Sequence, residues 1–173
     1  MEESEKRKKA EEAFRKEKYL IESLMDSSPD QIYFKDLQSR FIRINKTKAK
    51  KCNLNNPDEA VGKTDFDHFS DEHAKQAFDD EQRVIQTGIP IIGLVEKETW
   101  PDGHTTWAST SKLPLYDENG KIVGTFGMSR DITKLIDAEE SLKESEEKFR
   151  SLAEESPNMI YLNKNGRIIY VNK

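Results

Sequence analysis

Two segments of this chain repeat one sequence pattern at a long interval. Residues 23–46 and 151–173 align with one gap at a turn, and ten aligned positions carry the same residue. Each copy runs from the end of a charged helical segment through Ser-Pro into a predicted β-hairpin. A lone hairpin is marginally stable in water. We therefore expect a tandem repeat whose second copy, residues 153–173, is the truncated opening of a domain.

Composition excludes several classes of protein. Charged residues make up 35% of the chain, yet eight Phe, five Tyr and two Trp are too many for a disordered sequence. No run of about 18 apolar residues is present for a membrane span, and the N-terminus lacks the apolar core of a signal peptide. A single cysteine, Cys52, argues against a disulfide framework. We expect a cytoplasmic protein without direct membrane contact.

The net charge of -5 points away from nucleic acid as a partner. Residues 137–155 hold eight acidic and three basic side chains, so this stretch alone accounts for the acidic excess. The sequence therefore predicts that the chain does not bind nucleic acid.

The middle of the chain predicts an α+β domain. Charged residues without Gly or Pro predict an amphipathic helix in residues 1–26. Two short strands and several short helical turns follow, and then a longer helix over residues 72–87 that ends at Gly88. Three further strands are predicted, at residues 91–100, 105–116 and 122–130. This order indicates a five-stranded antiparallel sheet with helices on one face.

A second charged helix is predicted after Thr133. Leu135, Leu142 and Phe149 are spaced by seven residues and form a short apolar seam over residues 134–152. A charged helix with a thin seam is unstable alone. We favour pairing of two copies through this seam, and a solvated single helix between domains is the alternative.

Three motifs in this order resemble a PAS domain. Residues 124–133, Gly-Thr-Phe-Gly-Met-Ser-Arg-Asp-Ile-Thr, resemble its last strand and terminal Asp-Ile-Thr. Residues 100–107 resemble the turn between its third and fourth strands, and residues 28–32 resemble its entry. The resemblance covers residues 27–133, with the opening of another copy at 153–173. Tandem PAS units joined by helices are similar to the sensory part of histidine kinases.

The resemblance implies a mechanism. PAS domains hold a small ligand between sheet and helix and pass the change to the helix that leaves the last strand. Here the relay would be Asp131, Ile132 and Thr133, where a side-chain oxygen can also cap the following helix. The resemblance implies a non-catalytic fragment of a sensor histidine kinase whose catalytic domains lie outside these residues.

Apolar residues between the long helix and the sheet are candidates for the lining of a ligand pocket. Phe126 and Met128 share a face of the last strand, and other apolar side chains could face them. The candidate pocket residues are Phe78, Ile85, Leu94, Trp107, Phe126 and Met128. The interpretation we favour is that these side chains simply fill a solid core, which has the same sequence pattern as a core that encloses a small ligand.

Acidic and histidine residues cluster between residues 65 and 73. His68 and His73 lie five residues apart and cannot share one face of a helix, so no metal site is predicted. The cluster is interpreted as a helix start with solvated charges. His73 alone does not support haem, and Cys52 lacks the motif of flavin-binding PAS domains; the cofactor is left open.

Three functions follow from these observations. The first is a PAS sensor that binds a small ligand, dimerises through its flanking helices and relays a change along the second helix. The second is a ligand-free PAS spacer that only dimerises. The third is a small enzyme that uses the Asp/His cluster for acid–base chemistry, although no motif of a hydrolase, phosphate loop or dinucleotide fold is present.

Overall fold

The computed structural model describes residues 2–172 of the chain, which divides after Ile132 into two compact units. The elements of the first unit are α1 (Glu2–Ser27), β1 (Gln31–Asp36), β2 (Phe41–Ile44), α2 (Lys46–Lys51), the 3-10 turns η1 (Pro57–Ala60) and η2 (Asp65–Asp67), α3 (Asp71–Thr87), β3 (Ile91–Thr99), β4 (Thr105–Tyr116) and β5 (Ile122–Asp131). The second unit holds α4 (Thr133–Glu154), β6 (Tyr161–Lys164) and β7 (Arg167–Val171).

Local sequence signals set the ends of the helices. Asn45 caps α2 by accepting a hydrogen bond from the amide of Lys48. Ser70 caps α3 in the same way through the amide of His73, as its position before Asp71 indicates. Gly88 ends α3 in the left-handed region at a φ of 68°, where a side chain would be strained.

The first unit contains the predicted five-stranded antiparallel sheet. Its strand order is β2-β1-β5-β4-β3, and every neighbouring pair is antiparallel. The last strand, β5, therefore lies at the centre of the sheet, between the first strand and β4. The α+β fold expected from the sequence is confirmed.

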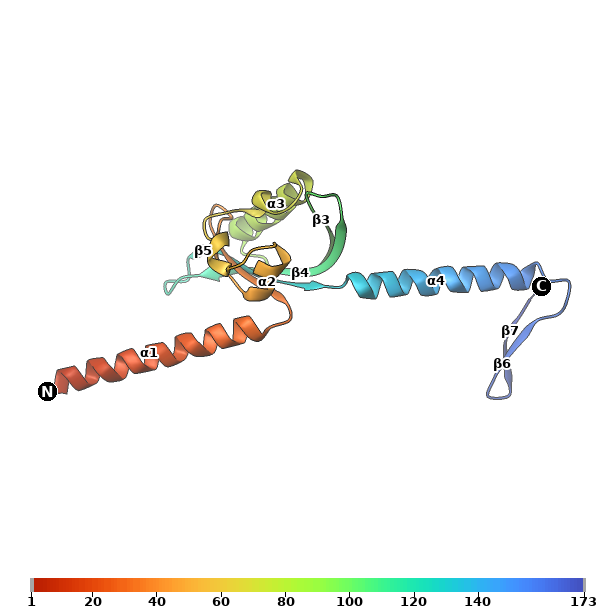
Figure 1. Ribbon diagram of the computed structural model, residues 1–173, viewed down its shortest axis with the longest axis horizontal. Helices are drawn as coiled ribbons and strands as arrows, with labels where there is room; N and C mark the ends of the chain where they lie inside the picture. Colours follow the sequence, from red (N-terminus) through yellow and green to blue (C-terminus); the bar gives the residue numbers. More distant parts are fainter. Residues whose placement is uncertain (1, 173) are drawn as a thin grey trace. The chain divides into compact units, whose positions relative to one another are not determined.

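Helix α3 lies across one face of this sheet and contacts β3, β4 and β5 (Figure 1). We call this the inner face. At the end of the sheet formed by β1 and β2, a small apolar cluster joins these strands to α2 and η1. Its members are Tyr33, Phe41, Ile44, Ala49 and Ala60. Beneath α3 the inner face is instead polar, because β1, β4 and β5 turn Lys35, Lys112 and Thr125 inward.

The second unit consists of a helix followed by a hairpin. Strands β6 and β7 pair antiparallel with an irregularity between Leu162 and Asn163. Asn172 accepts a hydrogen bond from the amide of Ile160 and so joins the two ends of the hairpin. This hairpin follows its helix in the same way as β1 and β2 follow α1.

Within residues 2–172, no helix has the length and apolar character to cross a membrane.

Candidate functional site

A small cavity lies between α3 and the inner face of the sheet. Its volume is about 20 Å³, which is room for about one water molecule. We call this cavity and its lining the polar cup. The charged side chains that line it are Lys48, Asp65, Glu81, Glu96, Glu98 and Lys112. Charged groups inside a small domain are costly to bury unless they are paired, so the cup is the feature that most needs a physical explanation.

A buried ion-pair network forms one wall of the cup. The Lys35 ammonium group on β1 contacts the carboxylate of Asp65, and it lies 2.6 Å from Glu81 Oε1 on α3. Lys35 and Glu81 are each only 1% exposed. The pairing satisfies a lysine that could not otherwise stay charged in the core.

Burial and pairing act in opposite directions on these groups. Burial alone would raise the pKa of Asp65, but the neighbouring Lys35 outweighs it and holds that pKa below its ordinary value. For Glu81 burial prevails over Lys35, and its pKa is raised. Burial would lower the pKa of Lys35, yet Asp65 and Glu81 raise it overall. The network therefore favours the charged forms of Lys35 and Asp65, while burial makes Glu81 harder to ionise than an ordinary glutamate.

Two more lysines face the cup. Lys112 on β4 donates to the backbone carbonyl of Ala77 at 3.4 Å and lies 3.5 Å from Asp80 Oδ2. The Lys48 ammonium lies over the rings of Tyr33 and Phe69, 5.6 and 4.7 Å from their centroids. Both cations are thus already engaged by carbonyl, carboxylate or aromatic groups.

Strand β3 contributes two carboxylates, Glu96 and Glu98, to the lining of the cup. Glu98 accepts a hydrogen bond of 2.8 Å from the hydroxyl of Thr106 on β4. Glu96 is 9% exposed, and its Oε2 has no hydrogen-bond partner among the described residues. An unpaired buried acceptor is rare in native proteins and indicates a missing donor.

The structure does not gather the six predicted pocket residues. Leu94 lies on the inner face beside Glu96, while Phe78 on α3 is 36% exposed and Ile85 is partly buried. Phe126, Met128 and Trp107 point to the other face of the sheet, away from α3.

Strand alternation explains this correction. In β5 the buried positions are Gly124, Thr125, Gly127 and Ser129. From Thr125 onward they alternate along the strand, so Phe126 and Met128 face outward. Phe126 stacks there on Phe34 of β1, with ring centroids 5.8 Å apart. The sequence pattern placed the apolar face of β5 inward, whereas the ion-pair network requires the polar face there.

The predicted relay residues lie where β5 ends. Asp131 is the last residue of β5 and pairs with Ala108 of β4, while Thr133 is the first residue of α4. The amide of Ile132 donates to the carbonyl of Trp107 at 2.9 Å. Asp131 also forms an ion pair of 2.6 Å with Lys51 at the end of α2. The end of β5 is thus fixed to both β4 and α2.

Sequence reasoning missed Asn45, which fixes the other end of the domain. Its Nδ2 donates to the carbonyls of Met25 and Asp30, each at 2.9 Å. Its Oδ1 accepts from the amides of Ile32 and Lys48, each at 3.0 Å. We call these four bonds the asparagine clasp; it joins the end of α1 to β1 and α2. The signal available in the sequence was the repeated Asn at the end of both hairpins.

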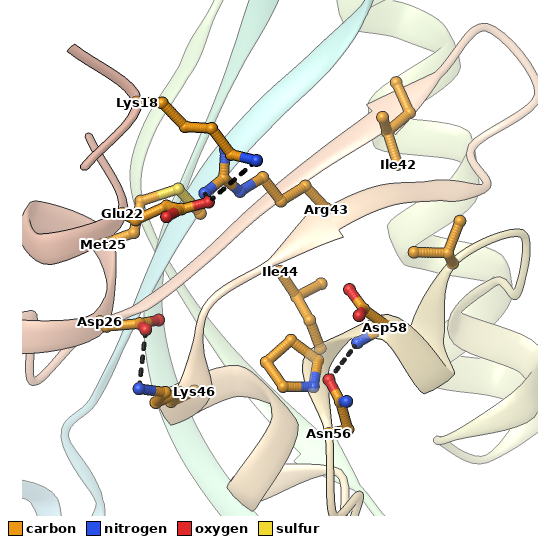
Figure 2. Close-up of a pocket in the computed structure, with 12 residues that line it drawn as sticks. Lys18, Glu22, Met25, Asp26, Ile42, Arg43, Ile44, Lys46, Asn56 and Asp58 are labelled. Carbon is orange, nitrogen blue, oxygen red and sulfur yellow. Dashed lines mark hydrogen bonds and ion pairs between the residues drawn. The ribbon is translucent and has the colours of Figure 1, made fainter. Parts of the chain in front are cut away.

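A surface groove of about 460 Å³ runs between α1 and β2 (Figure 2). Ile42 and Ile44 of β2 line it, and charged side chains of both signs surround it. Glu22 of α1 lies 3.5 Å from the guanidinium of Arg43, and Asp26 lies 2.9 Å from the ammonium of Lys46 (Figure 2). These pairs, together with the asparagine clasp, hold the last turns of α1 against the strand.

The predicted seam lies along α4. Leu135 and Leu142 are more than half exposed, and Phe149 is 44% exposed. The ring of Phe149 lies 5.8 Å from that of Tyr170 on β7. The seam is therefore an exposed apolar stripe on a charged helix.

The Asp/His cluster does not behave as one solvated group. Asp65 is buried against Lys35, which corrects the expectation of solvated charges. His68 is buried as well, and burial lowers the pKa of its imidazole. Within residues 2–172 no three His, Cys, Asp or Glu side chains are arranged to hold a metal ion. Cys52 is partly buried, and burial raises the pKa of its thiol.

A family model described as the PAS fold matches residues 25–136, and a model of the PAS domain matches residues 147–173. The chain belongs to the PAS family. The PAS module is a sensory unit and is itself non-catalytic. The asparagine clasp and the predicted relay residues both lie within the first matched segment.

Several known proteins are similar to this PAS chain. The methanogenesis regulatory histidine kinase FilI of Methanothrix harundinacea (strain 6Ac) is 29% identical over 116 residues, which cover 67% of this chain and 13% of the kinase. The structure of VqmA bound to DPO is 29% identical with a TM-score of 0.57, and the match covers 63% of this chain and 55% of VqmA. A PAS domain from Colwellia psychrerythraea is 25% identical with a TM-score of 0.55, over 65% and 93% of the two chains.

The expectation that this chain has no nucleic-acid partner is wrong. VqmA of Vibrio cholerae is a DNA-binding LuxR-type receptor, and it has been solved with ligand and DNA at 28% identity and a TM-score of 0.58. The acidic excess comes from the α4 region alone. In addition, the chain matches only 49% of that receptor. Net charge over a PAS module is therefore a poor guide to what the whole protein binds.

Proposed function

We propose that this PAS chain is the sensory part of a larger signalling protein, a sensor histidine kinase, and that the polar cup binds a small polar molecule. The observation that carries this proposal is Glu96, a nearly buried carboxylate in the cup with an oxygen that lacks a donor. Burying a polar group without a partner costs free energy, and a bound ligand that donates a hydrogen bond to it removes this cost. The resemblance to FilI supports the kinase context, and VqmA bound to DPO shows that a similar structure holds a small ligand.

The relay runs from the cup to α4. Ser129 lines the cup and lies on β5 two residues before Asp131. A ligand that moves the inner face shifts β5, and β5 leads directly through Ile132 and Thr133 into α4. Binding then biases the geometry of α4, as a ligand does with any element that has two states of similar free energy.

Dimerisation through α4 completes the proposal. The exposed Leu135, Leu142 and Phe149 have the spacing of a coiled-coil seam, and a second copy would cover them. In this organisation residues 1–26 form an entry helix, 27–133 the PAS domain, 134–152 the linker helix and 153–173 the start of a second PAS domain. The match of the second model to residues 147–173 supports the last assignment.

Native mass spectrometry of the purified chain tests the proposal directly. We expect a dimer that retains a small molecule, or one whose unfolding midpoint rises with members of a metabolite panel. A dimer that neither retains nor responds to any small molecule would contradict ligand sensing.

A ligand-free spacer is the second candidate. The cavity volume of about 20 Å³ favours it, because the cup as observed has no room for a metabolite. The two candidates differ in one measurable respect: in a sensor, α3 and β3 must move apart to admit a ligand to the cup, and in a spacer they need not. Faster hydrogen exchange in α3 and β3 than in β1 would therefore favour the sensor.

A further inference from the structure

The polar cup offers more free acceptors than free donors. Of its charged lining residues, four are carboxylates and two are lysines. Lys35, which lies behind the lining, compensates Asp65 and Glu81. Glu96 and Glu98 remain on β3, two residues apart and turned to the same side of the strand. They are the carboxylates of the cup whose charge the network does not pair.

The two lysines of the cup are poorly placed to bind an anion. The Lys112 ammonium is held by the carbonyl of Ala77 and by Asp80. The Lys48 ammonium lies over two aromatic rings. An anionic ligand would have to break these contacts. A cationic ligand instead finds Glu96 Oε2 without a partner.

We propose that the polar cup binds a small molecule through a protonated amine, with the ammonium group placed between Glu96 and Glu98. This inference rests on the proposed sensory function and adds the chemical class of the ligand. The ammonium supplies three donors, so it can satisfy Glu96 Oε2 and still reach Glu98, one oxygen of which already accepts from Thr106. Hydrogen bonds between an ammonium and carboxylates are about twice as strong as neutral ones.

The size of the cavity links binding to signalling. About 20 Å³ holds an ammonium-sized group but no carbon chain. The remainder of an amine must displace part of the wall, where Phe69 and His73 pack with ring centroids 4.7 Å apart. The amine therefore binds the open cup better than the closed one, and this difference in affinity is what shifts a conformational equilibrium.

Calorimetry and thermal unfolding of the purified chain test this assignment at constant ionic strength. The probes are methylammonium, ethanolammonium and putrescine, compared with methanol, ethylene glycol and acetate. We expect binding and a raised unfolding midpoint with at least one amine and none with the neutral or anionic probes. Glu96→Gln and Glu98→Gln should each weaken amine binding about tenfold, the loss of one charge-assisted hydrogen bond. Glu118→Gln, in the exposed turn between β4 and β5, is the matched control and should leave binding unchanged.

The outcomes separate this inference from the proposed function. If neutral or anionic probes bind and amines do not, the ligand class is wrong and ligand sensing stands. If no probe binds and the purified chain retains no small molecule, both fail. If Glu96→Gln does not fold, two other measurements decide. They are amine binding by Glu98→Gln and the amine-induced shifts of the amide resonances of residues 96–98 in the wild-type protein. If Glu98→Gln binds amines as the wild type does and these resonances do not shift, the assignment is overturned.

Discussion

Asn45 and Asn172 make three equivalent side-chain hydrogen bonds at the same place in the two repeats. Nδ2 of Asn45 donates to the carbonyl of Met25 at the end of α1, and Nδ2 of Asn172 donates to the carbonyl of Ala153 at the end of α4, both at 2.9 Å. Each Oδ1 accepts from an isoleucine amide near the start of the first hairpin strand: Ile32 is the second residue of β1, and Ile160 lies just before β6. The same arrangement of asparagine hydrogen bonds thus joins helix and hairpin in both repeats, which supports the assignment of residues 153–173 as the start of a second domain.

Replacing Asn45 should loosen the entry helix as well as destabilise the fold. Asn45→Ala removes four hydrogen bonds at a fully buried site, and we expect a loss of about 2–4 kcal/mol in the free energy of unfolding. Asn45→Asp keeps the acceptor for Ile32 and Lys48 but loses the donors to Met25 and Asp30. Hydrogen exchange in the last turns of α1 should therefore rise in both variants. Asn119→Ala, in the exposed turn after β4, is the matched control; equal exchange in α1 for Asn119→Ala and Asn45→Asp would contradict the role of the clasp.

Removing Lys35 should be among the most costly single changes in the chain. Lys35→Met leaves Asp65 and Glu81 buried without their cation, and breaking such a network costs about 3–5 kcal/mol. The triple variant Lys35→Met, Asp65→Asn, Glu81→Gln removes all three charges and should recover part of this loss. Urea unfolding measures both. A Lys35→Met protein as stable as the wild type would show that Asp65 and Glu81 do not depend on Lys35 for their stabilisation.

The contribution of Glu81 to the stability of the domain should fall as pH rises above about 4.5, the ordinary pKa of a glutamate. The pKa of Glu81 is raised in the folded state, so the folded protein holds a proton that the unfolded chain has released. Stability from this group is complete below the ordinary pKa and is lost as pH rises through the raised value.

Asp65 has the opposite sign. Its lowered pKa gives stability above the ordinary aspartate value, and this stability is lost as pH falls through the folded-state pKa. In Glu81→Gln, the free energy of unfolding measured as a function of pH should no longer fall above about pH 4.5. Its fall at low pH, which comes from Asp65, should remain. An unchanged profile in this variant would assign the pH dependence to other groups.

The contact between Lys51 and Asp131 should matter for the relay more than for stability. The pair is partly exposed, and such pairs contribute about 0–1 kcal/mol. Lys51→Met should therefore change the free energy of unfolding little, while hydrogen exchange at residues 130–136 increases. Lys50→Met, the neighbouring substitution on α2, serves as control. Exchange that is unchanged at the end of β5 would remove α2 from the relay.

Seam residues of α4 should control the oligomeric state. Leu142→Asp puts a charge on the apolar stripe, and we expect the proposed dimer to dissociate in sedimentation equilibrium. Lys143→Asp introduces the same side chain one residue away, off the seam, and should leave the dimer intact. A wild-type chain that is monomeric at all concentrations would contradict pairing through α4.

The order of elements could be predicted from the sequence because each carried a local signal. Ser70 before two acids and Gly88 at its end delimit α3, and alternation with turn residues delimits the last three strands. The central place of β5, which pairs with both β1 and β4, carries no such local signal and is seen only in the structure.

The interior of the site could not be predicted in the same way. Hydrophobic patterning assigns apolar side chains to the core, so it selected Phe126 and Met128 and overlooked Thr125 and Ser129 on the alternate positions. Lys35 lies far in sequence from Asp65 and Glu81, and no local pattern indicates that these three charges meet. A buried ionic network is a long-range property, visible only once the sheet and α3 are assembled.

The network around Lys35 also restricts how this domain can diverge. Any one of Lys35, Asp65 or Glu81 that mutates alone strands a charge in a dry interior, so the first step of each replacement is selected against. Homologous chains should accordingly keep all three residues or replace them together. An alignment in which the three positions vary independently would mean that a single replacement can be tolerated in this interior.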